Sequence, residues 1–90
     1  MTKHWIRTAK GRACHFDHLD EFVPDIEEIA HALSHICRYT GHVPNFYCVA
    51  QHCCLVASRC TPRFALAGLL HDATEAYIGD MSAPLKSIPN

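Results

Sequence analysis

The architecture depends most on residues 62–79, PRFALAGLLHDATEAYIG. Within them, residues 65–70 are apolar on every face of a helix, a pattern typical of a helix at the centre of a protein. Pro62 suits the first helical position, where its missing N–H costs nothing, and Gly79 suits the helix end. The stretch therefore predicts one central helix over residues 62–78.

Two more helices are predicted before it. Asp25 suits a helix N-cap, and Glu28 stands three residues later, as in a capping box. Apolar residues then follow at helical spacing, so we expect a helix over residues 25–39, with Gly41 as its stop. Apolar positions spaced by 4, 3 and 4 predict a second helix over residues 48–60.

The N-terminal part has a different pattern. Residues 4–9 and 12–16 read as short extended segments around Gly11, which can supply the turn of a hairpin. Residues 17–24 form an acidic connector, and the proline-containing tail at 81–90 has room for one short turn. The predicted fold class is mainly α, a bundle of about three helices preceded by a short β-hairpin.

Composition limits the size and setting of the protein. The 90 residues, 49% hydrophobic and 19% charged, fit one globular domain, which we divide into hairpin and connector (1–24) and helical part (25–90). A formal net charge of −1 provides no broad basic field, so no nucleic-acid duplex is expected as partner. No signal peptide is visible, and the longest apolar run, 64–70, is far short of the ~20 residues of a membrane span. We expect a soluble cytoplasmic protein with no membrane partner.

The unusual counts are eight histidines and six cysteines. Without a secretory signal and without a C-x-x-C pair, the cysteines, including the adjacent Cys53 and Cys54, are best interpreted as packing residues. His31 and His35, four residues apart, are interpreted as solvated or core-edge histidines. His15 and His18, by contrast, could touch a substrate.

Polar side chains follow directly on the most apolar part of the chain. His71 and Glu75 are four residues apart and share a helix face, with Asp72 within one turn of Glu75. A His–Asp pair satisfied by hydrogen bonds would explain them. If His52 of the preceding helix packs against them, two imidazoles and a carboxylate would instead suit a divalent Mn, Fe, Co, Ni or Zn ion.

Three stretches carry a resemblance that spans nearly the whole chain. VAQH at 49–52, LLHDATEA at 69–76 and GDMSAPLK at 79–86 resemble the HD-domain metal-dependent phosphohydrolases. The similarity is to the phage and bacterial nucleotide hydrolases that include the 5′-deoxynucleotidases. It implies an HD-domain-like helical bundle that binds a divalent metal ion, with Mg added to the candidate ions.

The resemblance also implies roles for single residues. His52, His71 and Asp72 match metal ligands, and Glu75 matches the catalytic acidic residue that helps position or activate the attacking water. Asp80 matches a residue near the substrate sugar. Arg38 and Tyr39, expected on the first helix, match an Arg–aromatic pair that contacts phosphate and base. The implied activity is hydrolysis of a deoxynucleotide mono- or triphosphate.

One ligand of the family is missing. The family's fourth metal ligand is an Asp on a later helix, and no acidic residue follows Asp80 here. We expect either the N-terminal half of a longer enzyme or a short module that binds nucleotide, metal or a protein partner without catalysis. If the chain ends at Asn90, the few helices available to cover the apolar helix predict a homo-oligomer, whereas in a longer protein the continuation would supply the covering helices. An iron oxygenase, the third interpretation of two His and one carboxylate, fits the ligand order less well.

Overall fold

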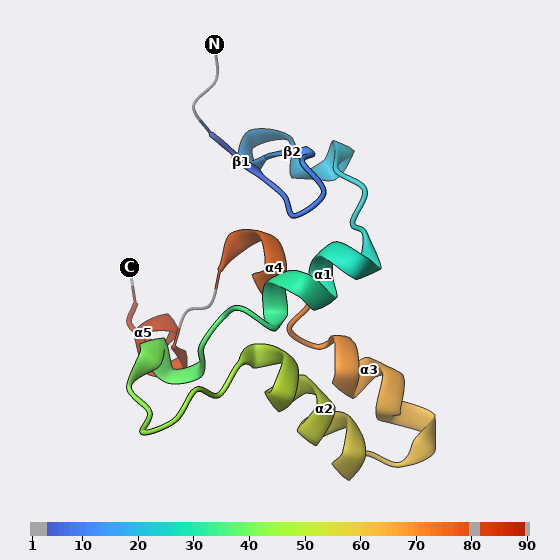
Figure 1. Cartoon of the computed structure of the whole chain (residues 1–90), viewed down its shortest axis with the longest axis vertical. Coiled ribbons are helices and arrows are strands. Elements are labelled where there is room, and N and C mark those ends of the chain that lie inside the picture. Colours follow the sequence, from blue (N-terminus) through green and yellow to red (C-terminus); the bar gives the residue numbers. More distant parts are fainter. Residues whose placement is uncertain (1–3, 80–81, 90) are drawn as a thin grey trace.

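The structure is a computed structural model that describes residues 4–79 and 82–89. A two-stranded hairpin comes first, and mainly helical chain follows it, as predicted (Figure 1). The elements are β1 (Trp5–Arg7), β2 (Ala13–His15), the 3-10 helix η1 (Phe16–Glu21), α1 (Ile26–Leu33), the 3-10 helix η2 (Arg38–Gly41), α2 (Val49–Arg59), the 3-10 helix η3 (Pro62–Phe64), α3 (Ala65–Leu70), α4 (Glu75–Ile78) and α5 (Ala83–Lys86).

The hairpin agrees with its prediction. β1 and β2 are antiparallel, with Ile6 opposite Cys14. Gly11 has a φ of +78°, the left-handed conformation that the tight turn requires and that glycine adopts without strain. The connector after β2 is more ordered than predicted, because residues 16–21 wind into η1.

α1 begins where predicted but ends earlier. The Asp25 carboxylate accepts the N–H of Glu28 at 3.0 Å, so the N-cap is confirmed. The helix stops at Leu33 instead of continuing to residue 39. The chain becomes extended at Cys37, where it pairs with Cys48 in an antiparallel β-bridge. This pairing ends α1 before Arg38 and Tyr39, which therefore lie on η2 and not on the first helix.

The predicted helix over 62–78 is divided. η3 and α3 cover its first half, residues 71–74 form a turn, and α4 covers the end. In the turn, the N–H of Ala73 bonds to the carbonyl of Leu70 at 3.0 Å, and the N–H of Glu75 bonds to that of Asp72 at 3.0 Å. These hydrogen bonds span three residues instead of the four of an α-helix, so the chain turns here. The prediction of one long helix is therefore wrong. Gly79, with a φ of +86°, ends α4 as expected.

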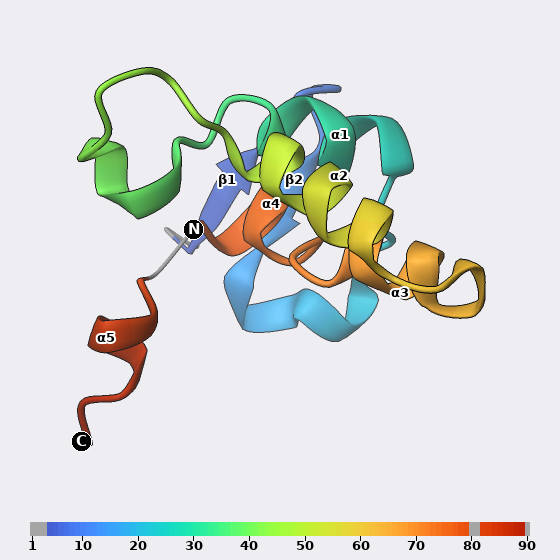
Figure 2. The same ribbon diagram turned by 90° about the horizontal axis from the view of Figure 1, so that it is seen from below.

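The core lies among α1, α2 and α4. Leu33, Val49 and Cys53 are buried there, with Ala76 of α4 packed against them. α2 and α3 lie side by side in both views, but Leu66 of α3 is 67% exposed (Figures 1 and 2). α3 is thus not the central helix that its composition predicts. In the described part of the chain, no helix is long and apolar enough to cross a membrane.

The cysteines largely fill space, as predicted. Cys14, Cys48 and Cys53 are buried, and all six cysteines are free thiols. Cys54 of α2 is exposed, so the packing interpretation is wrong for this one residue.

Candidate metal centre

Three residues predicted as metal ligands come together. His52 lies on α2, His71 directly follows α3, and Asp72 is in the turn after it. One ligand atom from each lies within 4.8 Å of the others. The packing of α2 against α3 and the turn at 71–74 bring them together, although His52 is separated from the other two by about twenty residues of sequence.

The spacing of the donor atoms suits a shared ion. Asp72 Oδ2 lies 3.0 Å from His71 Nε2 and 3.9 Å from His52 Nε2. Two donors about 2.1 Å from one ion and in a tetrahedral arrangement are about 3.4 Å apart. The two imidazole rings are 5.3 Å apart at 65°, so they converge on the carboxylate without stacking. The three residues can therefore hold a divalent ion with little rearrangement.

The orientation of His71 favours coordination. Its Nδ1 lies 2.6 Å from the carbonyl oxygen of Gly68, which can only accept a hydrogen bond. Nδ1 must then carry a proton, which leaves Nε2, 3.0 Å from Asp72 Oδ2, as the ring nitrogen that can bind an ion. A backbone carbonyl behind an imidazole is the usual means by which proteins fix a metal-binding tautomer.

Glu75 lies beside this cluster. It is the first residue of α4 and is only 8% exposed, and it lines a cavity of about 290 Å³ together with all three cluster residues. Under the cluster, burial raises the pKa of the Cys53 thiol, and the Asp72 carboxylate adds to this effect. This thiol therefore remains protonated and acts as packing beneath the site.

Arg38 and Tyr39 reach the same cavity from η2. The Arg38 guanidinium lies 4.8 Å from the centre of the Tyr39 ring, a cation–π contact. Tyr39 and Thr40 both have a φ of +56°, which is rare for residues with side chains and costs on the order of 1–3 kcal/mol each. Such strain concentrates at functional sites, and here it lies in the segment that contributes Arg38 and Tyr39 to the cavity.

One residue of this cavity was not predicted, and other candidate site residues lie elsewhere. Lys86 of α5 also lines the cavity. It was overlooked as a site residue, although it ends the GDMSAPLK stretch. Asp80 lies outside the described residues. His15 and His18 line a separate cavity next to η1, and His31 and His35 stack on each other at the exposed end of α1, with ring centres 4.3 Å apart.

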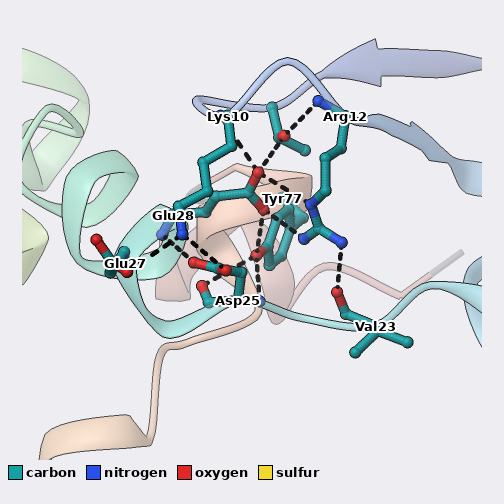
Figure 3. Close-up of polar contacts among 8 residues, drawn as sticks. Lys10, Arg12, Val23, Asp25, Glu27, Glu28 and Tyr77 are labelled. Atoms are coloured by element: carbon teal, nitrogen blue, oxygen red, sulfur yellow. Dashed lines mark hydrogen bonds and ion pairs between the residues drawn. The ribbon is translucent and has the colours of Figure 1, made fainter.

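A buried carboxylate that the sequence indicated only as part of a capping box ties the elements together. Glu28 of α1 is 2% exposed and accepts hydrogen bonds from the hydroxyl of Thr8, from Arg12 and from Tyr77 (Figure 3). Arg12 Nη2 lies 2.5 Å from one carboxylate oxygen and Arg12 Nε 3.2 Å from the other. Arg12, foremost, holds the pKa of Glu28 down to about 2, well below its usual value.

Glu28 does not complete the capping box that its position suggests. The N–H of Asp25 donates instead to the hydroxyl of Tyr77 at 3.1 Å, and this hydroxyl donates to Glu28 at 3.1 Å. Tyr77 lies two residues after Glu75 on α4. The network thus joins hairpin, α1 and α4, and it fixes the short helix that carries Glu75.

Fold and cluster define a mainly helical protein with a His–His–Asp cluster that can hold a metal ion. The chain is homologous to two curated proteins. It is 43% identical over 84 residues to "Uncharacterized protein YfdR" of Escherichia coli strain K12, covering 93% of this chain and 47% of that protein. It is 40% identical over 98 residues to "Uncharacterized protein RCAP_rcc00048" of Rhodobacter capsulatus, covering 97% of this chain and 49% of that protein. The chain spans about half the length of these relatives. No protein-family model matches it.

Proposed function

We propose that this chain forms the metal-binding part of an HD-domain phosphohydrolase that hydrolyses a phosphate ester of a deoxynucleotide in the cytoplasm. The observation that carries the proposal is the convergence of His52, His71 and Asp72 within 4.8 Å in a cavity that Glu75 also lines. A satisfied His–Asp pair would need only two of these residues. The third donor and the neighbouring buried carboxylate favour a metal centre.

A divalent ion held by these three residues would polarise a phosphoryl oxygen and make a bound water more acidic. Glu75 would accept or relay a proton from the attacking water, because its carboxylate lines the same cavity. Its burial keeps bulk water away from the carboxylate.

The cavity also supplies groups for the rest of a nucleotide. Arg38 can bind a phosphate with its planar guanidinium fork, and Lys86 of α5 adds a second positive charge to the cavity. Tyr39 is 57% exposed and can stack on a base. Asp80 remains our proposed contact to the sugar. The substrate is a deoxynucleoside mono- or triphosphate.

The relatives are about twice as long as this chain. In a protein of that length, we propose that the second half supplies the fourth ligand, an Asp. The competing function is a module that binds a nucleotide or metal without turnover. It is favoured by the three-membered cluster, since no fourth ligand joins it among residues 4–79 and 82–89.

Metal titration followed by a hydrolysis assay tests both functions. The 90-residue chain is titrated with Mn²⁺, Co²⁺, Ni²⁺, Zn²⁺, Fe²⁺ and Mg²⁺ in a calorimeter and then assayed for phosphate release from deoxynucleoside mono- and triphosphates. Metal binding with turnover supports the enzyme. Metal binding without turnover supports the module only if a protein of the relatives' full length is also inactive, because the proposed fourth ligand lies in the second half. His52→Ala should weaken metal binding at least ~10-fold, whereas the control His35→Ala should not. Equal metal affinity of the wild type and His52→Ala would contradict the proposed metal centre.

A further inference from the structure

Cys37 and Cys48 face each other across an antiparallel β-bridge. Both have extended backbone, with φ and ψ of −77° and 138° at Cys37 and of −97° and 164° at Cys48. Residues directly opposite in an antiparallel pair place their side chains on the same face. The two thiols are therefore neighbours, although ten residues of sequence lie between them.

The hydrogen bonds around the bridge define its type. The N–H of Arg38 donates to the carbonyl of Tyr47 at 2.7 Å, and the N–H of Val49 donates to that of Ile36 at 2.8 Å. These bonds flank the cysteines, which exchange none themselves, so they form a non-hydrogen-bonded pair. In such a pair the Cα atoms are about 4.5 Å apart, within the range of about 4.4–6.8 Å that a disulfide spans.

The other neighbouring cysteines lack this geometry. Cys53 and Cys54 are consecutive on α2, and consecutive helical residues point to different faces. Cys53 is accordingly buried, whereas Cys54 is exposed.

We propose that Cys37 and Cys48 form a reversible redox pair that links the Arg38–Tyr39 segment to the start of α2. Cys37 is partly exposed, and Cys48 is only 5% exposed. Cys37 is thus the thiol that reacts first with an external disulfide such as oxidised glutathione, and Cys48 is the resolving thiol.

The chemistry is two exchange steps. The Cys37 thiolate attacks one sulfur of oxidised glutathione, forms a mixed disulfide and releases one glutathione thiolate. The Cys48 thiolate then attacks Cys37 Sγ, forms the Cys37–Cys48 bond and releases the second glutathione. The protein loses two electrons and two protons, and oxidised glutathione is reduced to two molecules of the thiol.

The position of the pair gives the bond a consequence. Cys37 directly precedes Arg38 and Tyr39, and Cys48 directly precedes α2, which carries His52. Oxidation would close residues 38–47 into a loop and restrict the motion of Arg38 and Tyr39 relative to His52. Its effect on nucleotide binding rests on the proposed function, but bond formation does not.

Mass spectrometry without metal or substrate tests the pair separately from the proposed function. The 90-residue chain is equilibrated with oxidised and reduced glutathione at increasing ratios, and the remaining thiols are then blocked with iodoacetamide. We expect a species that is two hydrogen atoms lighter than the reduced chain and in which two thiols carry no iodoacetamide label. Its fragments should be joined at Cys37 and Cys48, and dithiothreitol should reverse the bond.

Matched variants identify the bond. Cys54→Ser removes an exposed thiol of the same region and should still form the bond, whereas Cys37→Ser and Cys48→Ser should not. Wild-type protein in which both thiols are blocked at every ratio would overturn the proposal. A bond that joins other cysteines, or glutathione that stays attached to Cys37, would also overturn it. The wild-type experiment decides even if a variant fails to fold.

Discussion

At the scale of single residues, the candidate site depends on how each polar group is held. His71 is oriented by the carbonyl of Gly68, and Asp72 lies between the two imidazoles. Glu75 is buried next to them but is not a member of the three-donor cluster. This arrangement separates residues that would hold an ion from a residue that would move a proton.

Replacing Glu75 tests this separation. Glu75→Gln keeps the size of the side chain but removes its ability to accept a proton, so we expect phosphate release to slow by roughly 10²–10⁴-fold. Metal affinity measured by calorimetry should stay close to that of the wild type, because the three donors are untouched. Unchanged turnover with bound metal would show that Glu75 takes no part in the reaction.

At the scale of elements, short helices are held by specific contacts more than by their own length. α4 has only four residues, and Tyr77 anchors it to Glu28 of α1 and to the Asp25 backbone. Phe22 packs edge-on against the Tyr77 ring, 4.8 Å away. Loss of this anchor would disturb α4 and, with it, Glu75.

Acid should weaken the network around Glu28. The pKa of Glu28 is about 2 in the fold, against 4.5 for the ordinary group, chiefly because Arg12 donates hydrogen bonds to it. Because this pKa is lower in the fold than in the unfolded chain, the ionised Glu28 carboxylate stabilises the fold fully above about pH 4.5. This contribution disappears as the pH falls toward 2. We expect Glu28→Gln to be less stable than the wild type at pH 7 and to lose less stability between about pH 5 and pH 2.

Urea unfolding at each pH measures this difference. The matched control is Glu27→Gln, since the Glu27 side chain is 80% exposed on the same helix and should contribute little. Tyr77→Phe should lower the free energy of unfolding by about 1 kcal/mol at pH 7, because it removes the hydroxyl that bonds to both Asp25 and Glu28. Parallel stability curves for the wild type and Glu28→Gln would contradict the assignment.

Another prediction concerns the close contact between α2 and α3. A Cβ on Gly68 would come within 2.8 Å of Cys60 Sγ and 3.3 Å of Val56 Cγ1. Gly68→Val should therefore separate the helices and destabilise the fold by about 1–3 kcal/mol. Ala67→Val, on the exposed side of the same helix, is the control in thermal unfolding. Equal effects of both changes would mean that the helices do not pack closely at Gly68.

At the scale of the whole molecule, apolar surface is left uncovered. An apolar cavity of about 270 Å³ between α1, α2 and α3 is lined by residues that include Leu69 and Leu70. Among the lining side chains, Ile26 is 63% exposed, and Leu69 and Leu70 are each 38% exposed. Exposed apolar surface of this kind predicts an interface with another chain or segment.

We expect a chain of these 90 residues to self-associate through this surface. Light scattering coupled to size-exclusion chromatography should give a mass above 10.1 kDa. Leu70→Lys, which places a charge in the apolar cavity, should shift the protein toward monomer, whereas Leu85→Lys on α5 should not. A wild-type monomer that unfolds cooperatively at every concentration tested would contradict the prediction.

Local signals in the sequence determined the parts of the fold that depend on neighbouring residues. The glycine turn of the hairpin, the Asp25 cap and the extent of α2 follow from conformational preferences and helical spacing, which act within a few residues. The sequence also identified His52, His71 and Asp72 as candidate metal ligands, through the residue types and motifs.

Contacts between distant residues decided the rest. α1 ends early because Cys37 pairs with Cys48, and the last predicted helix is split by a turn that helical periodicity does not reveal. Glu28 reads as half of a capping box, yet its carboxylate bonds to Arg12 and Tyr77. These partners are far away in sequence, and only the packed structure sets the free energy of pairing them.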